Sequence, residues 1–287
     1  MALADVERRR DAVEERLVEV IERVEPPELA AEMEDMLLAG GKRVRPTVTL
    51  LVCEAVGDLP ETGHPKRALD FAVGIELVHN ASLVVDDIID RSEVRRGHPS
   101  AWAAYGHGPA IVTSDGLLGE AFALFSADPR ATENVADAMV ELGEGEATEL
   151  VAEPTDEEEY MELARRKTGA LFRAAAQLGV IAVDGDAETV RTAGEYAEHV
   201  GVAFQIRDDV LDATADAADL GKPTGRDAEL ERPSILQVTD LTPAEADTLA
   251  RERATAAEDA LDRLDLPSSD AHRYLSELAR FVVERER

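Results

Sequence analysis

Two short segments of this sequence repeat one spacing of aspartates, Asp-Asp-x-x-Asp. They are Asp86-Asp87-Ile88-Ile89-Asp90 and Asp208-Asp209-Val210-Leu211-Asp212. Residues four positions apart lie on one face of a helix, so each segment would present two carboxylates to one point. The flanking residues are mostly apolar, and burying a carboxylate costs on the order of several kcal/mol unless it is paired or binds a metal. Ligation by oxygen alone suits Mg²⁺ together with phosphate oxygens. The segments therefore favour a metal–phosphate site, and solvated acidic helix faces are the alternative.

Cationic segments complete the candidate site. Residues 40–46, Gly-Gly-Lys-Arg-Val-Arg-Pro, place three cations after a glycine turn, which suits an anionic group; a helix end with ordinary surface arginines is the alternative. Further cations lie in Arg95-Arg96-Gly97, Lys167-Thr168-Gly169 and Gly221-Lys222-Pro223. The chain has only four lysines, and three of them lie in these segments. This placement suggests that the compact ammonium group is needed there.

His79 lies seven residues before the first aspartate motif, two helical turns earlier and on nearly the same face. A lone histidine is more often a packed core residue than a binding residue. Its distance from Asp86 nevertheless makes it a candidate for the same site.

Composition restricts the partners of this 287-residue chain. Thirty basic and 61 acidic residues give a formal charge of −31, which disfavours nucleic acid and a polybasic membrane anchor. The single cysteine excludes a disulfide framework. No run of 18 apolar residues and no apolar leader segment are present, so the protein is predicted to be cytoplasmic and not membrane-spanning.

The basic residues are unusual in kind, since only four of the thirty are lysine. Few lysines and many carboxylates are typical of proteins that work in concentrated salt, where the Debye length shrinks to about 3 Å at 1 M and self-repulsion is screened. The alternative is a merely acidic protein from a high-GC genome. We expect a halophilic protein.

The pattern of apolar residues is helical along nearly the whole chain. Helices are predicted over 3–24, 28–38, 66–90, 109–126, 130–150, 168–183, 187–200, 201–213 and 269–285. Thr155 and Glu158 have capping-box spacing and predict a helix from about 156, and Thr242 predicts another. Residues 91–108 are expected to be a loop with a short helical piece, and 216–233 a turn-rich loop. No strand pair or internal repeat is expected, so the prediction is a single all-α domain over residues 1–287.

With these motifs in chain order, the sequence resembles the trans-isoprenyl diphosphate synthases, the head-to-tail prenyltransferases. The resemblance extends from Gly40 to about Leu236. Besides the segments above, it includes Trp102-x-x-Tyr105-Gly106, Asp115-x-Leu117-Leu118, Phe204-Gln205 before the second aspartate motif, and Asp227. It implies a helical bundle around a deep central cavity, the isoprenoid synthase fold, and usually a homodimer.

The resemblance also implies roles for the site residues. Asp86, Asp90 and Asp208 would hold Mg²⁺ on the allylic diphosphate. The other three aspartates would either bind Mg²⁺ as well or contact its ligands; they are Asp87, Asp209 and Asp212. The residues expected to bind that diphosphate are Arg95, Lys167, Thr168, Gln205 and Lys222. Those expected to bind isopentenyl diphosphate are Lys42, Arg45, His79 and Arg96.

In the implied reaction, metal ions and cations neutralise the allylic diphosphate until its C–O bond ionises. The double bond of isopentenyl diphosphate attacks the allylic cation, and a proton is then lost to the released diphosphate. The cavity must be dry, because water would quench the cation. One departure from the family pattern is Glu231-Arg232-Pro233-Ser234, where Gly-Lys-x-Thr is usual. The lysine contact that the family makes from this last loop is therefore either replaced by Arg232 or lost.

Product length depends on the residues before the first aspartate motif. In this family, the residues four and five positions before Asp86 help to form the floor under the growing chain. Here they are Ser82 and Ala81, both small, whereas short-product enzymes usually have an aromatic residue there. Geranylgeranyl diphosphate is therefore expected, as in haloarchaeal lipid synthesis, and a chain of twenty-five or more carbons is the alternative. Phe122 and Phe125 are candidates for the floor or else core aromatics.

Other functions remain to be distinguished. A terpene cyclase or head-to-head synthase would share the aspartate motifs but would not need the cationic segment at 40–46. A non-catalytic family subunit usually lacks one aspartate motif, and both are intact here. A structural helical protein with acidic faces would bind no diphosphate in the presence of Mg²⁺.

Overall fold

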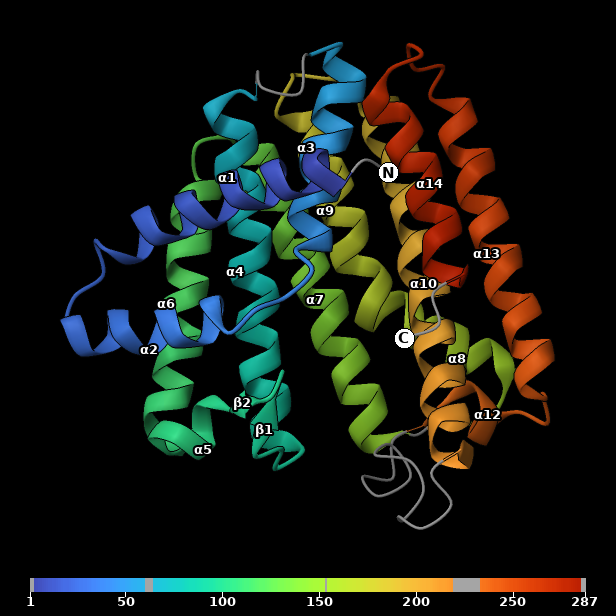
Figure 1. Ribbon diagram of the computed structural model, residues 1–287, viewed down its shortest axis with the longest axis horizontal. Coiled ribbons are helices and arrows are strands. Elements are labelled where there is room, and N and C mark those ends of the chain that lie inside the picture. The colour runs from blue at the N-terminus through green and yellow to red at the C-terminus, as the bar shows by residue number, and fades with distance from the viewer. Residues whose placement is uncertain (1–2, 60–63, 153, 219–232, 285–287) are drawn as a thin grey trace.

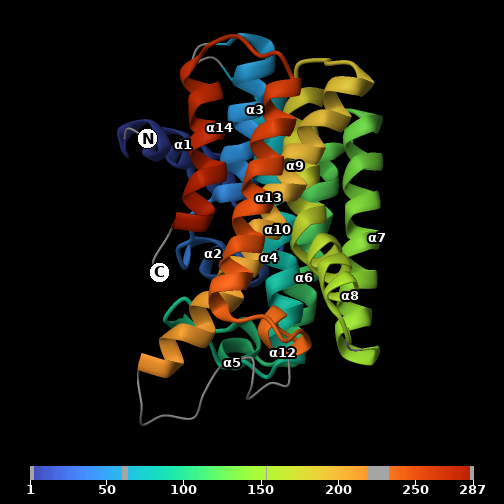
Figure 2. The same cartoon turned by 90° about the vertical axis from the view of Figure 1, so that its right-hand side faces the viewer.

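The computed structural model describes residues 3–59, 64–152, 154–218 and 233–284, and it is built almost entirely of helices (Figure 1). The helices that run side by side through the molecule are α3 (Val44–Gly57), α4 (Lys66–Ile89), α6 (His107–Phe125), α7 (Pro129–Val151), α9 (Ala170–Ile181) and α10 (Ala187–Ala218). Helices α1 (Leu3–Ile21) and α2 (Pro27–Leu38) cross them on one side, and α13 (Pro243–Arg263) and α14 (Asp270–Glu284) cover the other (Figures 1 and 2). The predicted all-α bundle is confirmed.

Helices α3 and α9 lie at the centre of the bundle, and nearly all their residues are buried. Alanines make up much of α9, so its neighbours approach closely, and Thr49 on α3 donates a hydrogen bond of 2.8 Å to the carbonyl of Ala175. Buried apolar side chains join into one core from Val13 on α1 to Val283 on α14. This packing stabilises the frame that holds the site.

Helix α4 is long and apolar enough to cross a membrane by length and composition alone. However, 67 % of that apolar window is buried inside the bundle, against α3, α6 and α9. The buried position accounts for the apolar composition, and α4 is therefore a core helix.

Helix α10 corrects one prediction. The sequence predicted separate helices over 187–200 and 201–213, whereas the structure has one continuous helix through Gly201. A Cβ atom at position 201 would lie 3.0 Å from the ring of Phe172 and 3.1 Å from the Cα atom of Gly169. Gly201 therefore serves close packing against α9 and does not end the helix.

Three further details differ from the prediction. Strands β1 (Val94–Arg95) and β2 (His98–Pro99) form a small antiparallel ladder where no strand pair was expected, before the short helix α5 (Ala101–Tyr105). Helix α8 (Glu157–Ala164) is capped by Asp156, which accepts from the amide of Glu159, so Thr155 and Glu158 are not its capping box. Helices α3 and α12 (Ile235–Val238) were not predicted.

The helix predicted over 168–183 is also continuous with α8. A π-turn, η1 (Arg165–Gly169), joins α8 to α9, and the amide of Ala170 donates to the carbonyl of Arg165 across five residues. Periodicity cannot reveal such a turn, because one extra residue shifts the apolar pattern without interrupting it. By contrast, the capping box of Thr242 with Glu245 at the start of α13 is confirmed.

Candidate active site

One cavity of about 910 Å³ brings most of the predicted residues together. Its walls come from the 40–45 segment and α4 on one side, and from α9, α10 and η1 on the other. The predicted residues that line it are Lys42, Arg45, His79, Ser82, Asp86, Arg95, Arg96, Lys167, Thr168, Gln205, Asp208, Asp209 and Asp212. Segments up to 170 residues apart in the sequence thus share one enclosed space.

The acidic part of the cavity joins the two aspartate motifs. Asp86 projects from the last turns of α4, and Asp208 and Asp212 project from α10. Asp90 caps the C-terminus of α4 and does not line the cavity. Both motifs therefore present carboxylates to the same space, but the first motif contributes only Asp86 of the pair Asp86 and Asp90 that the sequence predicted.

The middle aspartate of each motif is buried and tied to the protein. Asp87, 3 % exposed, accepts a forked pair of hydrogen bonds of 2.7–2.9 Å from Arg95. Asp209, 5 % exposed, accepts from the Tyr160 hydroxyl at 2.6 Å and from the amide of Ile235 at 2.8 Å. These two carboxylates hold the walls of the site in place, and Asp87 lies behind the cavity wall.

The cationic part of the cavity lies around the start of α3. Lys42 is exposed, Arg45 is partly buried, and Arg96 reaches over from the loop between β1 and β2 to donate to the carbonyl of Gly40. Burial lowers the pKa of Arg45 to about 10, and burial together with the charge of Arg43 lowers the pKa of Arg96. A lowered arginine pKa means that the charge lacks sufficient compensation, which a bound anion would supply.

The guanidinium group of Arg45 packs against an aromatic ring. Its guanidinium carbon lies 4.6 Å from the ring centroid of Phe172 on α9, and its Nε atom is buried without a hydrogen-bond partner. His79 lies in the same region. Burial and the nearby charges of Arg45 and Arg96 keep the pKa of His79 well below its ordinary value, so it is a neutral hydrogen-bonding group at pH 7.

Arg43 has a different role from its neighbours. Its backbone is left-handed (φ 48°), which turns its buried side chain away from Lys42 and toward Glu76 at 2.8 Å. Glu76 also accepts from Asn80 at 3.0 Å. Arg43 therefore fastens the start of α3 to α4, and it lines the cavity beside Lys42 and Arg45.

The π-turn supplies Lys167 and Thr168. Thr168 donates to the side-chain oxygen of Gln205 at 2.7 Å, and Gln205 in turn donates to Asp209 at 3.0 Å. The Lys167 ammonium lies 3.2 Å from Glu146 on α7 and also contacts Glu149. This hydrogen-bonded chain couples η1 to the second aspartate motif.

The donor set fits a hard divalent cation. The acidic part of the cavity offers carboxylate oxygens from two facing helices, which Mg²⁺ prefers. Among the residues that the structure describes, no three Asp, Glu, His or Cys side chains are grouped closely enough to hold a metal by themselves. The arrangement suits a cation that also takes oxygens from water and from a bound diphosphate.

The predicted floor residues differ in position. Ser82 lines the cavity, and its hydroxyl donates to the carbonyl of His79 at 2.8 Å. Ala81 is 1 % exposed and lies in the core, where its carbonyl accepts from Ser114 at 3.1 Å. Phe125 is fully buried, with its ring centroid 6.2 Å from that of Phe122. Neither ring lines the cavity.

Some predicted residues lie outside the described residues. They are Lys222, Gly221, Pro223, Asp227 and Arg232. Ser234, at the end of the unusual segment, is described and forms a capping box with Gln237 at the start of α12. Its hydroxyl therefore has a structural role there.

Several site residues were missed by the sequence reasoning. Glu146 and Glu149 on α7, Tyr160 on α8 and Phe172 on α9 contact predicted residues or line the cavity. In a chain with 61 acidic residues, two more glutamates give no signal. The close pair Gly145-Glu146 within a helical pattern was the available clue, because an interior glycine needs a packing reason.

Comparisons with known proteins agree with this geometry. The model of the family described as Polyprenyl synthetase matches residues 26–264. Geranylfarnesyl diphosphate synthase of Aeropyrum pernix is 34 % identical over 92 % of this chain and 87 % of its own. The crystal structure of geranylgeranyl pyrophosphate synthetase from Pyrococcus horikoshii is 35 % identical, with a TM-score of 0.82 over 99 % of this chain and 98 % of its own. A polyprenyl synthase from Caulobacter crescentus, complexed with calcium and isoprenyl diphosphate, has a TM-score of 0.82 at 26 % identity over 100 % of this chain and 96 % of its own. The chain therefore belongs to the polyprenyl synthetase family and is a trans-prenyltransferase with the isoprenoid synthase fold.

Proposed function

We propose that this enzyme uses Mg²⁺ to condense isopentenyl diphosphate with an allylic diphosphate and makes geranylgeranyl diphosphate. The observation that carries the proposal is the charge pattern of the cavity of about 910 Å³. Carboxylates of Asp86, Asp208 and Asp212 line one part, and Lys42 and Arg45 line another. Two diphosphates can therefore bind side by side through different chemistry.

The cationic part would bind isopentenyl diphosphate directly. Arg45 is held by Phe172 and lacks a partner for its Nε atom, so an anion would compensate a charge that is already in place. Neutral His79 can donate one further hydrogen bond without adding charge. Lys42 and Arg96 complete this half of the site. Preformed donors of this kind bind a diphosphate with little reorganisation.

The acidic part would bind the allylic diphosphate. Its metal ligands are proposed to be Asp86 and Asp208, which line the cavity, together with Asp90, which caps α4 one turn further along that helix. When bound, Mg²⁺ neutralises the charge that develops on the leaving diphosphate. The cations and polar groups proposed to contact the same diphosphate are Arg95, Lys167, Thr168, Gln205 and Lys222. Asp212 lies at this end of the cavity.

The reaction then follows from the placement of the two groups. The allylic C–O bond breaks and the diphosphate leaves with the electron pair, while Lys167 on η1 helps to stabilise its charge. The double bond of isopentenyl diphosphate forms the new C–C bond, and the proton lost from it passes to the released diphosphate. Leu142, Leu171 and Phe204 line the cavity and exclude water from the cation.

Product length is proposed to follow from the small residues on α4. Ser82 lines the cavity one turn below Asp86, so a growing chain meets a hydroxyl there and no aromatic ring. The similar proteins named above include synthases of geranylgeranyl and geranylfarnesyl diphosphate. These features support twenty carbons as the product and twenty-five as the next candidate.

The proposed setting is a single-domain, cytoplasmic enzyme that works in concentrated salt. The net charge of −31 with only four lysines supports the salt requirement. Dilution from molar KCl into low salt should lower the unfolding temperature of the purified protein by more than 10 °C. An unfolding temperature that does not change with salt would contradict this part of the proposal.

A homodimer is also proposed. Ile111 and Val112 on α6 are 51 % and 54 % exposed, and α6 packs against α4, where Val85 and Ile89 are exposed. Apolar surface of this kind in such an acidic chain suits a second copy of the same chain. Analytical ultracentrifugation at micromolar concentration should give twice the chain mass of 31.0 kDa.

The experiment for the main proposal is a prenyl-transfer assay in molar KCl. Purified protein is incubated with Mg²⁺, labelled isopentenyl diphosphate and dimethylallyl, geranyl or farnesyl diphosphate, and the dephosphorylated products are separated by chain length. Geranylgeraniol as the main product supports the proposal. A product of a different length refutes the chain-length part, and no prenyl product with any primer refutes elongation.

A further inference from the structure

The π-turn η1 is the element that presents Lys167 and Thr168 to the cavity. A π-turn is less stable than an α-helical turn, so the neighbouring structure must hold it in place. Two sets of contacts do so. One is a close approach of backbone from α7, and the other is a network of ion pairs on the side away from the aspartate motifs.

The close approach is made at Gly145. This glycine is buried in α7, and a Cβ atom there would lie 3.1 Å from the backbone nitrogen of Lys167 and 3.1 Å from the Cβ atom of Arg166. Both atoms belong to the π-turn and cannot rotate away, so a side chain at 145 must push the turn itself. Gly143, two residues earlier in the same helix, is exposed and would place its Cβ atom in open space.

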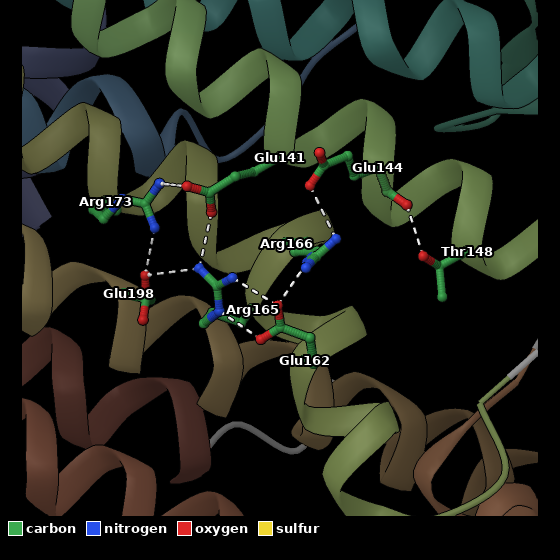
Figure 3. Close-up of polar contacts among 8 residues, drawn as sticks. All are labelled: Glu141, Glu144, Thr148, Glu162, Arg165, Arg166, Arg173 and Glu198. Carbon is green, nitrogen blue, oxygen red and sulfur yellow. Dashed lines mark hydrogen bonds and ion pairs between the residues drawn. The ribbon is translucent and has the colours of Figure 1, made fainter.

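The ion-pair network joins η1 to the helices around it (Figure 3). Arg165 donates two hydrogen bonds of 2.8 Å to Glu162 on α8, and a third of 2.9 Å to Glu141 on α7. Arg166 donates to Glu162 at 2.6 Å and to Glu144 on α7 at 2.9 Å. Exposed ion pairs contribute little stability one by one, but two-pronged pairs in a network fix geometry.

The network continues into the helices that line the cavity. Arg173 on α9 donates to Glu141 at 2.5 Å and to Glu198 on α10 at 2.7 Å (Figure 3). Four helices are therefore tied together around the π-turn. By contrast, the segment that carries Lys42 and Arg45 makes no contact with this network in the described part of the chain.

We propose that Gly145 and the network around Arg165 are positioning elements that set the place of Lys167 and Thr168, and through them the recognition of the allylic diphosphate. The inference rests on the proposed function, which assigns these two side chains to that diphosphate. Recognition of isopentenyl diphosphate does not depend on them, because its proposed cations lie in the 40–45 segment at the start of α3 and on the loop between β1 and β2. A change at Gly145 should therefore raise KM for the allylic diphosphate and leave KM for isopentenyl diphosphate unchanged.

The test compares matched variants at two glycines. Gly145→Ala displaces the turn by a few tenths of an ångström, and we expect KM for the allylic diphosphate to rise about fivefold to tenfold, and further in Gly145→Val. KM for isopentenyl diphosphate should stay within twofold. Gly143→Ala and Gly143→Val should change neither KM. If both KM values stay unchanged in Gly145→Val, or both rise equally, the inference is overturned.

A second pair of variants tests the network without altering α7. Arg165→Gln should raise KM for the allylic diphosphate alone. Arg165→Lys keeps the charge and should raise that KM less. Arg191→Gln, which removes the exposed pair with Glu195 on α10, is the control. A rise in KM that the control shares overturns the role of the network.

Failure of the proposed function can be told apart from failure of the inference. If the wild type transfers no prenyl group, the proposed function fails. The positioning role is then decided by Mg²⁺-dependent binding of inorganic diphosphate in titration calorimetry. Weaker binding by Gly145→Ala than by Gly143→Ala supports the role, and equal binding overturns it.

Discussion

Arg45 offers the sharpest test of how the cavity is built, because the structure predicts that replacing it stabilises the protein or leaves it unchanged. Burial lowers the pKa of Arg45 to about 10, which at about 1.4 kcal/mol per pH unit corresponds to roughly 3 kcal/mol of unfavourable burial. The cation–π contact with Phe172 stabilises the folded state by about 2 kcal/mol. Arg45→Met removes both the cost of burying the charge and the contact with Phe172, so the free energy of unfolding should rise by about 1 kcal/mol or stay the same.

Binding should respond in the opposite direction. Loss of a buried charged group that contacts a diphosphate weakens binding by about 2–5 kcal/mol, which is at least about 30-fold at 1.4 kcal/mol per tenfold. KM for isopentenyl diphosphate should therefore rise at least about 30-fold in Arg45→Met. The assays are urea unfolding without substrate and steady-state kinetics in molar KCl.

Arg43→Met is the control, two residues earlier and fully buried where Arg45 is partly buried. It leaves Glu76, which is 2 % exposed, without its ion-pair partner, and breaking a buried pair costs about 3–5 kcal/mol. Arg43→Met should therefore destabilise the protein, unlike Arg45→Met. If Arg45→Met loses 2 kcal/mol or more of stability while KM for isopentenyl diphosphate stays unchanged, the assignment of Arg45 is refuted.

Three further predictions follow from the same structure. Asp86→Ala and Asp208→Ala should each lower turnover by at least about 1000-fold in the prenyl-transfer assay, and near wild-type rates in both would remove their metal role. Ala81→Phe should shorten the main product, because the ring must extend toward the cavity from its buried position; an unchanged product would place the floor elsewhere. The hydrogen bonds from Arg165 hold the pKa of Glu162 at about 2, below the ordinary 4.5. The stability that this pair contributes is complete above about pH 4.5 and is lost as the pH falls toward 2, so urea unfolding of Arg165→Gln should depend less on pH in that interval; an unchanged dependence would contradict the pairing.

The sequence predicted most of the helices, though not α3, and many of the residues that line the cavity, because both depend on local patterns. Apolar periodicity marks the buried faces of α4 and α9, and the Asp-Asp-x-x-Asp spacing places carboxylates on one face of a helix. The capping box at Thr242 is equally local. Each of these signals is complete within a few residues, so no knowledge of the rest of the fold is needed.

The errors came from features that depend on distant partners. Gly201 resembles a helix end until Phe172 is seen against it, and η1 is defined by a backbone pattern that any composition can adopt. The resemblance implied that Ala81 and Ser82 both help to form the floor; the structure places Ser82 on the cavity wall and buries Ala81, whose carbonyl accepts from Ser114. Neighbouring positions on a helix point in directions about 100° apart, so burial decides which one reaches the cavity.

The roles within each aspartate motif show the same limit. Spacing puts the first and third aspartates of a motif on one face, but it does not reveal that Arg95 holds Asp87 and Tyr160 holds Asp209. These partners lie eight and 49 residues away in the sequence. The division between carboxylates that face the cavity and carboxylates that brace its walls becomes visible only when the helices are packed together.

The most direct test of the account is the metal dependence of binding at the two halves of the cavity. Calorimetry would compare isopentenyl diphosphate with an unreactive thio analogue of an allylic diphosphate, each with Mg²⁺ and with the metal chelated. We predict that chelation abolishes binding of the allylic analogue and changes the affinity for isopentenyl diphosphate by less than about threefold. Binding of the allylic analogue that survives chelation, or equal loss of both ligands, would contradict the division of the cavity into a metal-dependent half and a cationic half.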